Sequence, residues 1–251
     1  MGQIGKFDTD ASALQKRVRS HDEFGSRELN DWIFTHLKLR PNLRVLDVGC
    51  GFGKQSIVML REGCNVVAVD ASDASIDVLN KKAIAEGLSS GLLTISSEFD
   101  DMVLPDVKFD CAVSSYAFYY SKDRLKVLSL IHEKLKVGGA LFICGPAYSN
   151  NQGMKNLLKE AGVLFGEGSA PFMEDEGPEL FQQVFGNVQK SYFENEIIFP
   201  NAEEVWKYWS SHNMFDATIE NSFKANLDSH FSSADKFVTK KVAVGLLSFK
   251  Q

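Results

Sequence analysis

The chain has 251 residues, 44% of them hydrophobic, and a net charge of -6, values that suit one globular α/β domain and leave too little length for two full domains. This acidic balance argues against a nucleic-acid backbone as the main partner, because such binding needs a clustered Lys and Arg surface. No apolar run reaches the roughly 18 residues that span a bilayer, and residues 1–10 lack the features of a secretory signal, so we expect a cytoplasmic protein without a membrane partner.

The first half of the chain predicts a helical segment followed by a parallel sheet. Residues 1–40 are expected to form the N-terminal helical segment. From residue 42 onward, short β-branched runs alternate with helical stretches, which is the pattern of βαβ units in a mostly parallel sheet buried on both faces. Ser72 and Ser121 are predicted to cap the helices after the second and fourth strands. The first five strands are predicted at residues 43–48, 66–70, 92–96, 109–115 and 140–145.

The regular alternation is interrupted after residue 145. Residues 146–177 contain one predicted helix, near 154–164, and then a stretch rich in glycine, serine and acidic residues. Such a stretch has many soft points in its backbone and few obvious anchors. We therefore interpret residues 146–177 as an insertion that forms a cap and acts as a mobile lid, with a fixed helical layer over the sheet as the alternative.

The sheet resumes in the last third of the chain. Asn201 and Glu204 fit a capping box at the start of one helix, and Lys236, Lys240 and Lys241 are interpreted as lysines that protect a strand edge. The predicted order is a helix at 178–185, a strand at 188–199, two helices, and a strand at 237–249. We expect a single domain with four parts: the N-terminal segment 1–40, the core 41–145, the cap insertion and its following helix 146–187, and the C-terminal part 188–251.

A glycine-rich turn follows the first predicted strand and carries the strongest local signal. Gly49, Gly51 and Gly53 come directly after a buried strand and before a predicted helix. Glycines in this place let the backbone turn sharply and approach a ligand closely, and the helix start presents free N–H donors. Asp70 ends the next predicted strand, where Rossmann-type folds place an acid that binds ribose hydroxyls. The sequence therefore predicts a nucleotide-type cradle.

A nicotinamide dinucleotide site has a related pattern but fits these residues less well. Its third glycine lies five positions after the first, where this chain has Lys54. The acid at Asp47 has no counterpart in that pattern.

The order and spacing of several features resemble the class I S-adenosylmethionine-dependent methyltransferases. These features are the glycine turn, Asp70, the strand that starts at Phe109, and the glycine turn at residues 135–139 before another strand. The resemblance covers residues 43–145 well and the remainder loosely. It implies a Rossmann-like α/β fold with a mostly parallel seven-stranded sheet, helices on both faces, and S-adenosylmethionine as the cofactor.

The resemblance also implies where the cofactor lies. Asp47 and the glycine turn would hold its methionine part, and Asp70 its ribose. An acidic residue and its neighbour after the third strand would hold the adenine: counting back from Phe109 favours Glu98, whereas counting back from Leu104 favours Asp100. The predicted cofactor-binding residues are Asp47, Gly49, Cys50, Gly51, Gly53, Asp70, Ala71, Glu98, Phe99, Ser115 and Tyr116.

The catalytic candidates are less well defined by the sequence. Methyl transfer from a sulfonium needs alignment in a dry pocket, so a general base is optional. Many members of the family have a histidine near the position of Tyr119, and this chain departs from them. Tyr119 could line the sulfonium or serve only in packing. His21 and His212 are the candidates for a general base, with a surface or capping role as the alternative.

We expect methyl transfer to an oxygen or nitrogen atom of a small molecule, with a protein methyltransferase or a catalytically silent binding module as alternatives. The scattered histidines and cysteines show no ligand spacing, so no metal is expected. The sequence does not define the oligomeric state.

Overall fold

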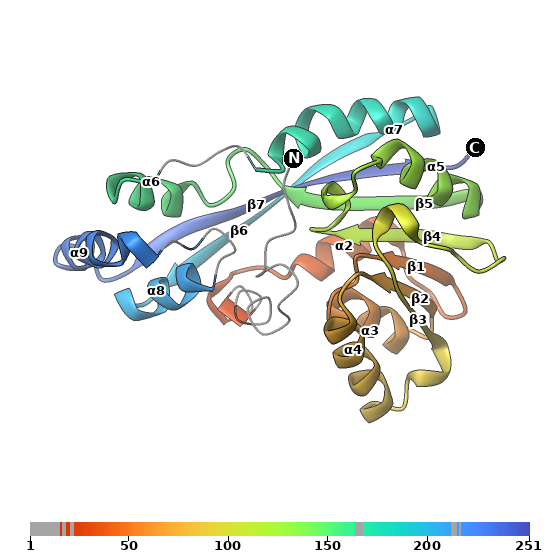
Figure 1. The fold of residues 1–251 in the computed structure, drawn as a ribbon, viewed down its shortest axis with the longest axis horizontal. Helices are drawn as coiled ribbons and strands as arrows, with labels where there is room; N and C mark the ends of the chain where they lie inside the picture. Colours follow the sequence, from red (N-terminus) through yellow and green to blue (C-terminus); the bar gives the residue numbers. More distant parts are fainter. Residues whose placement is uncertain (1–15, 17–18, 21–22, 164–167, 212–214, 216) are drawn as a thin grey trace.

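The strand order in the computed structural model is β3-β2-β1-β4-β5-β7-β6 (Figure 1). The structure describes residues 16, 19–20, 23–163, 168–211, 215 and 217–251. Strands β1 to β5 run parallel, and β7 runs antiparallel to both of its neighbours, β5 and β6. The predicted mostly parallel, seven-stranded sheet is therefore confirmed. The strands are β1 (Arg44–Val48), β2 (Asn65–Asp70), β3 (Leu92–Ser96), β4 (Phe109–Ser115), β5 (Leu135–Pro146), β6 (Gln189–Phe199) and β7 (Phe237–Phe249).

Strand β5 begins at Leu135, earlier than the predicted start at residue 140. Leu135 pairs with Phe109, and the register then shifts before Ala140 pairs with Cys111. The stretch between these pairs contains Gly138 in a left-handed conformation, with a φ of 76°. A β-bulge of this kind looks like a turn in the sequence, because it has polar residues and glycines.

Helices cover both faces of the sheet, as predicted. One face is buried beneath α2, α3 and α4, with Ile33, Ile57 and Leu79 in its core. The other face is buried beneath α5 and α7, with Leu128 and Phe181 in its core. These helices are α2 (Leu29–Leu37), α3 (Lys54–Arg61), α4 (Asp73–Ala85), α5 (Arg124–Lys134) and α7 (Gly177–Phe185).

One predicted helix cap is confirmed and another is wrong. The Ser72 hydroxyl accepts a backbone N–H at 3.2 Å and caps α4. Helix α5 starts later than expected, and its cap is Asp123, which accepts the backbone N–H of Lys126 at 3.1 Å. Ser121 instead donates to the Asp100 carboxylate at 2.8 Å, so its hydroxyl ties the chain to the loop after β3.

Strands β6 and β7 extend past the end of β5. The last pair between β5 and β7 joins Pro146 and Ala243, whereas β6 and β7 remain paired over residues 194–199 and 237–242. These two stretches form a two-stranded segment, the ribbon, which leads away from the rest of the sheet (Figure 1). Three helices gather around it: α6 (Gln152–Glu160), α8 (Ala202–Ser210) and α9 (Glu220–Phe231).

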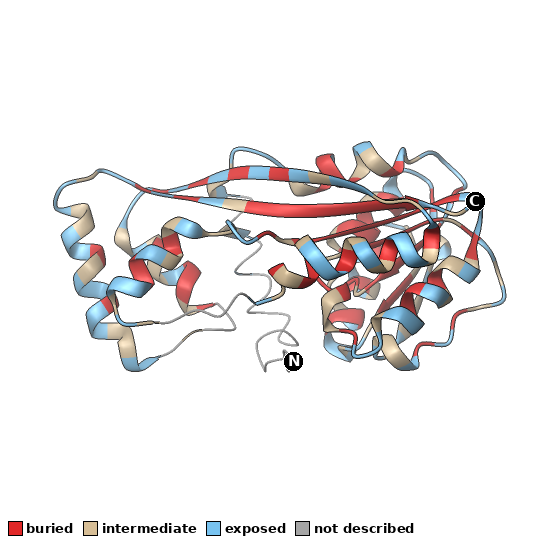
Figure 2. Cartoon of the chain, turned by 90° about the horizontal axis from the view of Figure 1, so that it is seen from above, coloured by how far each residue is buried: buried red, intermediate tan, exposed pale blue. Residues whose placement is uncertain are grey.

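The ribbon and these three helices form a cap with its own hydrophobic core. Leu158 of α6, Trp209 of α8, Phe223 of α9 and Phe199 of the ribbon are buried together in it. Seen from above, buried stretches lie both in this cap and in the layers around the parallel strands, and the long strands join the two (Figure 2).

The two apolar layers on the faces of the parallel part of the sheet are together called the main core. The insertion at residues 146–177 is divided between the cap and this main core. Its first part provides α6, which ends at Glu160, before the predicted end at residue 164, a position outside the described residues. Its second part, a π-helical turn at Phe172–Glu176, buries Met173 in the main core. Glu174 there accepts hydrogen bonds from the Tyr192 hydroxyl at 2.7 Å and from the Tyr148 backbone N–H at 3.2 Å. This part is therefore anchored to the sheet, unlike the soft segment that its composition suggested.

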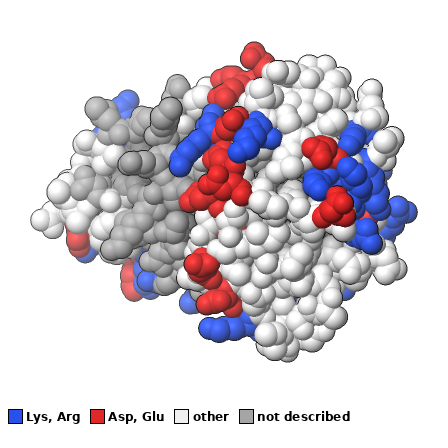
Figure 3. All heavy atoms as spheres, turned by 45° about the vertical axis from the view of Figure 1, so that its right-hand side comes forward, with Lys and Arg blue, Asp and Glu red and all other residues white. Residues whose placement is uncertain are grey.

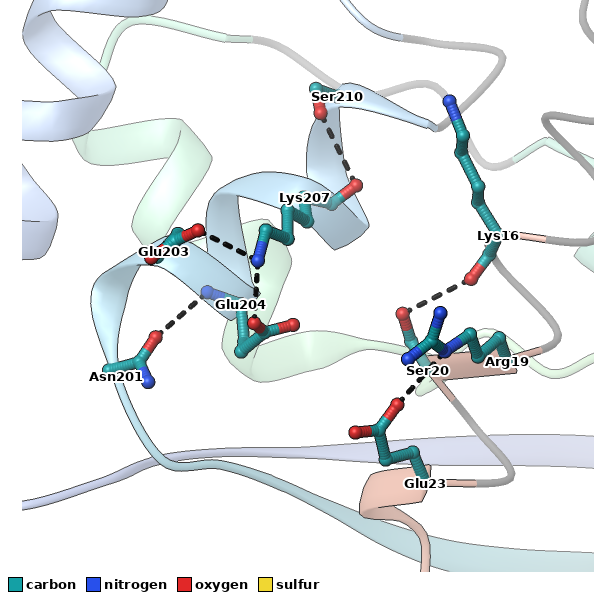
Figure 4. Close-up of polar contacts among 9 residues, drawn as sticks. All are labelled: Lys16, Arg19, Ser20, Glu23, Asn201, Glu203, Glu204, Lys207 and Ser210. Carbon is teal, nitrogen blue, oxygen red and sulfur yellow. Dashed lines mark hydrogen bonds and ion pairs between the residues drawn. The ribbon is translucent and has the colours of Figure 1, made fainter.

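Residues 24–27 lie against strand β6 of the ribbon. Phe24 packs against Phe199 of the cap, with 5.4 Å between ring centroids. The buried Asn195 side chain accepts the backbone N–H groups of Ser26 and Arg27 at 2.8 and 2.9 Å. The ion pair Arg19–Glu23 lies just before this segment in the sequence (Figure 4). Figure 4 also shows the Asn201 side chain, which caps α8 by accepting the Glu204 N–H at 3.0 Å, as predicted.

Candidate functional site

The glycine turn between β1 and α3 has the left-handed backbone that the sequence predicts. Gly49, Gly51 and Gly53 have φ values of 74°, 52° and 83°. A Cβ on Gly49 would lie 2.3 Å from the Cβ of Ala117, and a Cβ on Gly53 would lie 2.3 Å from Leu79 Cδ1. These two glycines are therefore required by the packing of the chain on itself, in addition to any ligand.

Asp70 lies at the carboxyl end of β2 and is held by backbone donors. Its two carboxylate oxygens accept the N–H groups of Gly51 at 2.7 Å and Ser72 at 2.9 Å. Burial raises the pKa of Asp70, and these two backbone hydrogen bonds oppose that shift. A carboxylate oxygen can accept more than one hydrogen bond, so Asp70 keeps acceptor capacity for two ligand hydroxyls.

Asp47 is a buried carboxylate with one oxygen left over. Its side chain is only 1% exposed, and Oδ2 accepts the Ser56 hydroxyl at 2.6 Å. Among the described residues, Oδ1 has no hydrogen-bond partner. Burial raises the pKa of Asp47 to about 7, against the opposing effect of the Ser56 hydrogen bond. A buried, unpaired acceptor beside a glycine turn fits a ligand that brings a hydrogen-bond donor, such as the ammonium group of a methionine moiety.

The structure distinguishes the two acidic candidates after β3. The Asp100 carboxylate accepts three hydrogen bonds, from the Ser121 hydroxyl and from the backbone N–H groups of Lys122 and Asp123, at 2.8 to 3.0 Å. Asp100 therefore has a structural task at the start of α5. Glu98 is exposed at the start of the short helix Phe99–Asp101, which leaves it as the better candidate for an adenine contact.

Phe99 lies beside the glycine turn. Its Cζ would be 3.0 Å from a Cβ placed on Gly49, so the ring approaches the turn closely. Its ring also meets Phe118 edge-on, with 6.2 Å between centroids. Phe99, the neighbour of Glu98, thus forms one aromatic wall of the predicted cofactor cradle.

The carboxyl end of β4 brings Ser115, Tyr116 and Tyr119 to the same edge of the sheet as the glycine turn. Tyr116 has a left-handed backbone, with a φ of 57°, which is uncommon for a residue with a side chain and concentrates at functional sites. The Ser115 hydroxyl accepts the Cys144 thiol at 3.4 Å. Tyr119 Cε1 would be 2.9 Å from a Cβ on Gly145, so its ring packs closely against the end of β5.

Lys241 is an additional candidate that the sequence pattern did not identify. Its ammonium lies 4.7 Å from the centroid of the Tyr116 ring, whereas the neighbouring Lys240 pairs with Glu194 at 3.7 Å. Lys240 thus fits the predicted edge role, because the ribbon lacks β5 on one side. The sequence pattern does not separate two consecutive lysines whose side chains lie on opposite faces of a strand.

The remaining predicted site residues divide into two groups. His21 and His212 lie outside the described residues. The Cys50 side chain is buried in the core, and its backbone N–H donates to the Val69 carbonyl at 3.0 Å. Ala71 is exposed just after β2.

Within the described ranges, no group of three or more His, Cys, Asp or Glu side chains is placed to hold a metal ion, and no helix is long and apolar enough to cross a membrane. Figure 3 shows a group of Lys and Arg side chains at the right with acidic side chains among them.

Comparison with known proteins finds similarity over the part of the chain that contains these features. Residues 46–143 match the model of a methyltransferase domain. The cypemycin N-terminal methyltransferase of Streptomyces sp is 33% identical over 116 residues, which are 45% of this chain and 45% of that protein. The ubiquinone biosynthesis O-methyltransferase of Cereibacter sphaeroides is 33% identical over 108 residues, 43% of this chain and 42% of that protein. The chain therefore spans less than half the length of these curated relatives.

A solved structure shows the same fold. The crystal structure of a putative methyltransferase from Bacillus halodurans has a TM-score of 0.62 at 14% sequence identity, and the match covers 88% of this chain and 98% of that chain.

Proposed function

We propose that this chain, which carries a class I S-adenosylmethionine-dependent methyltransferase domain, transfers a methyl group from that cofactor to an oxygen or nitrogen atom of a small molecule. The observation that carries this proposal is the arrangement at the carboxyl ends of β1 and β2. There the left-handed glycine turn, the unpaired Oδ1 of Asp47 and the acceptor oxygens of Asp70 lie together. These groups match the ammonium and ribose hydroxyls of the cofactor in chemistry and in order along the chain.

The residues of this chain would act mainly by binding and alignment. When bound, S-adenosylmethionine supplies a methyl group on a positively charged sulfur with a neutral leaving group. Asp47 and Asp70 would hold the cofactor in place, with Glu98 and Phe99 at its adenine. The rings of Tyr116 and Tyr119, beside Gly145 and Lys241, would form the wall toward the acceptor and exclude water from it. His21 and His212 remain proposed proton acceptors.

The cap supports a small acceptor. Lys241 of the ribbon lies over the Tyr116 ring at the end of β4, and Asn151 at the start of α6 donates to the Tyr208 hydroxyl of α8. A site between two packed units is a common place for a small-molecule pocket. The cytoplasmic location and the absence of nucleic-acid partners remain predictions.

A peptide or protein amine is the second candidate acceptor. One relative is named as an N-terminal methyltransferase, whereas another is named as an O-methyltransferase of ubiquinone biosynthesis. A catalytically silent module that binds the cofactor is the third reading.

Two measurements test these proposals. Calorimetric titration with S-adenosylmethionine should show binding, and its failure would remove the cofactor assignment. Transfer of a labelled methyl group should then be measured to a panel of small alcohols, phenols and amines, and to a peptide with a free N-terminus. Transfer to small molecules supports the main proposal, transfer to the peptide alone supports the second, and binding without any transfer supports a silent module.

A further inference from the structure

Three buried polar atoms without a hydrogen-bond partner lie where the cap meets the main core. They are the Tyr116 hydroxyl at the end of β4, the Asn151 side-chain oxygen at the start of α6, and the Thr239 hydroxyl on the ribbon. Each of the three is unpaired among the described residues. Buried polar groups in proteins are nearly always paired, so unpaired ones call for an explanation such as a ligand.

Contacts on the cap side join two of these residues. The Asn151 side-chain nitrogen donates to the Tyr208 hydroxyl at 2.8 Å. Burial raises the pKa of the Tyr116 hydroxyl well above its usual range, and Tyr208 adds to this shift as its smallest cause. The backbone N–H of Asn151 donates to the carbonyl of Lys240 at 2.8 Å, which fixes the start of α6 against the ribbon.

Contacts on the ribbon side complete the group. Thr239 and Lys241 are two positions apart on β7, so their side chains lie on the same face of the strand. Lys241 covers the ring of Tyr116 at 4.7 Å, and Thr239 Oγ1 would be 3.2 Å from a Cβ on Gly153 of α6. These contacts connect Tyr116, Asn151 and Thr239 through Tyr208, Lys241 and Gly153 into one group of residues, the polar junction.

The polar junction interrupts an otherwise apolar face of β6 and β7. On that face Phe193 and Ala243 belong to the main core, and Ile197 and Phe237 belong to the cap core. Between them lies the pair Asn195–Lys241. A strand face that changes from apolar to polar and back, at the same level as the end of β4, is suited to hold a polar group between two apolar walls.

The donors of the junction indicate the kind of group it binds. The Tyr116 phenol is protonated at neutral pH and, being buried without a partner among the described residues, can donate a hydrogen bond to a ligand. The Thr239 hydroxyl can donate or accept, whereas the unpaired Asn151 oxygen can only accept. A hydroxyl group both donates and accepts, so it can pair with all three, whereas a carboxylate would leave the Asn151 oxygen without a partner. The Lys241 ammonium places a positive charge beside the phenol, which disfavours a second ammonium at the same place and favours oxygen groups.

We infer that the polar junction binds the methyl acceptor through a hydroxyl group and discriminates against a protonated amine. This inference rests on the proposed methyl transfer and names the class of acceptor for it. Tyr116, Thr239 and Lys241 are then specificity-determining residues.

Three probes of similar size, benzyl alcohol, benzoate and benzylamine, test the inference on the full chain loaded with S-adenosylhomocysteine. Calorimetry or ligand-observed NMR should show that benzyl alcohol binds at least about tenfold more tightly than benzylamine, and more tightly than benzoate, which has no donor for Asn151. Thr239→Val should weaken the binding of benzyl alcohol about tenfold and leave the affinity for S-adenosylhomocysteine unchanged. Lys241→Met should reduce the discrimination against benzylamine.

The controls separate this inference from the proposed function. Thr94→Val makes the same change on β3, where Thr94 bonds to Asn80 rather than to the junction, and should leave probe binding unchanged. Benzylamine or benzoate binding as tightly as benzyl alcohol, or no binding of any probe to the loaded protein, would overturn the inference while cofactor binding stands. Failure to bind S-adenosylhomocysteine itself would instead overturn the proposed function.

Discussion

At the scale of single residues, Asp47 has opposite effects on stability and on binding. The unpaired Oδ1 costs stability in the cofactor-free protein, because a buried charge lacks a partner. The pKa is raised from 3.8 to about 7, and each pKa unit is 1.36 kcal/mol, so the cost above pH 7 is at most about 4 kcal/mol. A donor from the cofactor would remove this cost on binding.

Asp47→Asn should therefore stabilise the cofactor-free protein and weaken cofactor binding. At pH 8 the melting temperature should rise by about 2–4 °C for each kcal/mol recovered, while the affinity for S-adenosylmethionine falls about tenfold or more. Thermal scans and calorimetry on the same preparations measure both effects. A variant that loses stability at pH 8 would contradict the assignment of Asp47 as an unpaired buried charge.

The stability difference between Asp47→Asn and the wild type should depend on pH, and its direction follows from the raised pKa of Asp47. Because the native state raises the pKa of Asp47, it binds this proton more tightly than the unfolded state does. The cost is therefore absent below about pH 4 and complete above about pH 7. The difference in melting temperature between Asp47→Asn and the wild type should shrink as the pH is lowered from 8 to 5.

Asp70→Ala should weaken S-adenosylmethionine binding by one to two orders of magnitude, about 1.5–3 kcal/mol, because charge-assisted hydrogen bonds to the ribose are lost. The same carboxylate also supports the N–H groups of Gly51 and Ser72, so Asp70→Asn, which keeps one acceptor oxygen, is the milder comparison. Unchanged affinity in calorimetry would remove the ribose assignment.

Glu98 and Asp100 should separate by function and stability. Glu98→Ala should lower the affinity for S-adenosylmethionine several-fold and leave the melting temperature almost unchanged, since the side chain is exposed. Asp100→Ala should lower stability by about 1–3 kcal/mol, because three donors lose their acceptor. The reverse pattern would assign the adenine contact to Asp100.

At the scale of elements, the sequence predicts most of what local chemistry controls. The structure contains the strands predicted from the β-branched runs, the Ser72 and Asn201 caps, and the glycine turn. Each of these features depends on a few neighbouring residues. The predicted cap of α5 at Ser121 is wrong, and Asp123 caps the helix instead. The reason is that the Ser121 hydroxyl binds the Asp100 carboxylate, which is distant in the sequence.

The candidate site could be predicted only in part, because some of its residues come together through contacts between segments that are distant in the sequence. Asp47, Asp70 and the glycines belong to one continuous pattern. Thr239 and Lys241 reach the end of β4 only because β7 runs antiparallel between β5 and β6, a pairing that no local pattern shows.

The glycine turn as an element gives a further prediction. Gly51→Val should abolish cofactor binding, because a branched residue is strained at a φ of 52° and its Cβ would occupy space next to the ligand. Cys50→Ala should cost little binding, because the thiol is buried in the core. Circular dichroism checks that Gly51→Val still folds, and retained binding in that variant would mean that the turn is only structural.

At the scale of the whole molecule, two hydrophobic cores share one pair of long strands. The main core and the cap core are both filled by large buried side chains, and the polar junction lies between them. An acceptor bound at the junction would therefore contact both units. Part of the binding free energy of the acceptor would then stabilise the contact between the cap and the main core.

This arrangement predicts that the two parts of the insertion respond differently to ligand. Met173 is fully buried in the main core, and Glu174 is tied to Tyr148 and Tyr192, so amides at 172–176 should be strongly protected from hydrogen exchange with or without ligand. Helix α6 buries Leu157 and Leu158 only within the cap, so residues 152–160 should gain protection when S-adenosylhomocysteine and an acceptor bind. Hydrogen exchange by mass spectrometry on the free and loaded protein measures both segments at once. Equal, strong protection of residues 152–160 in both states would show that the cap is a fixed layer, and ligand-dependent protection at 172–176 would show that the whole insertion moves as a lid.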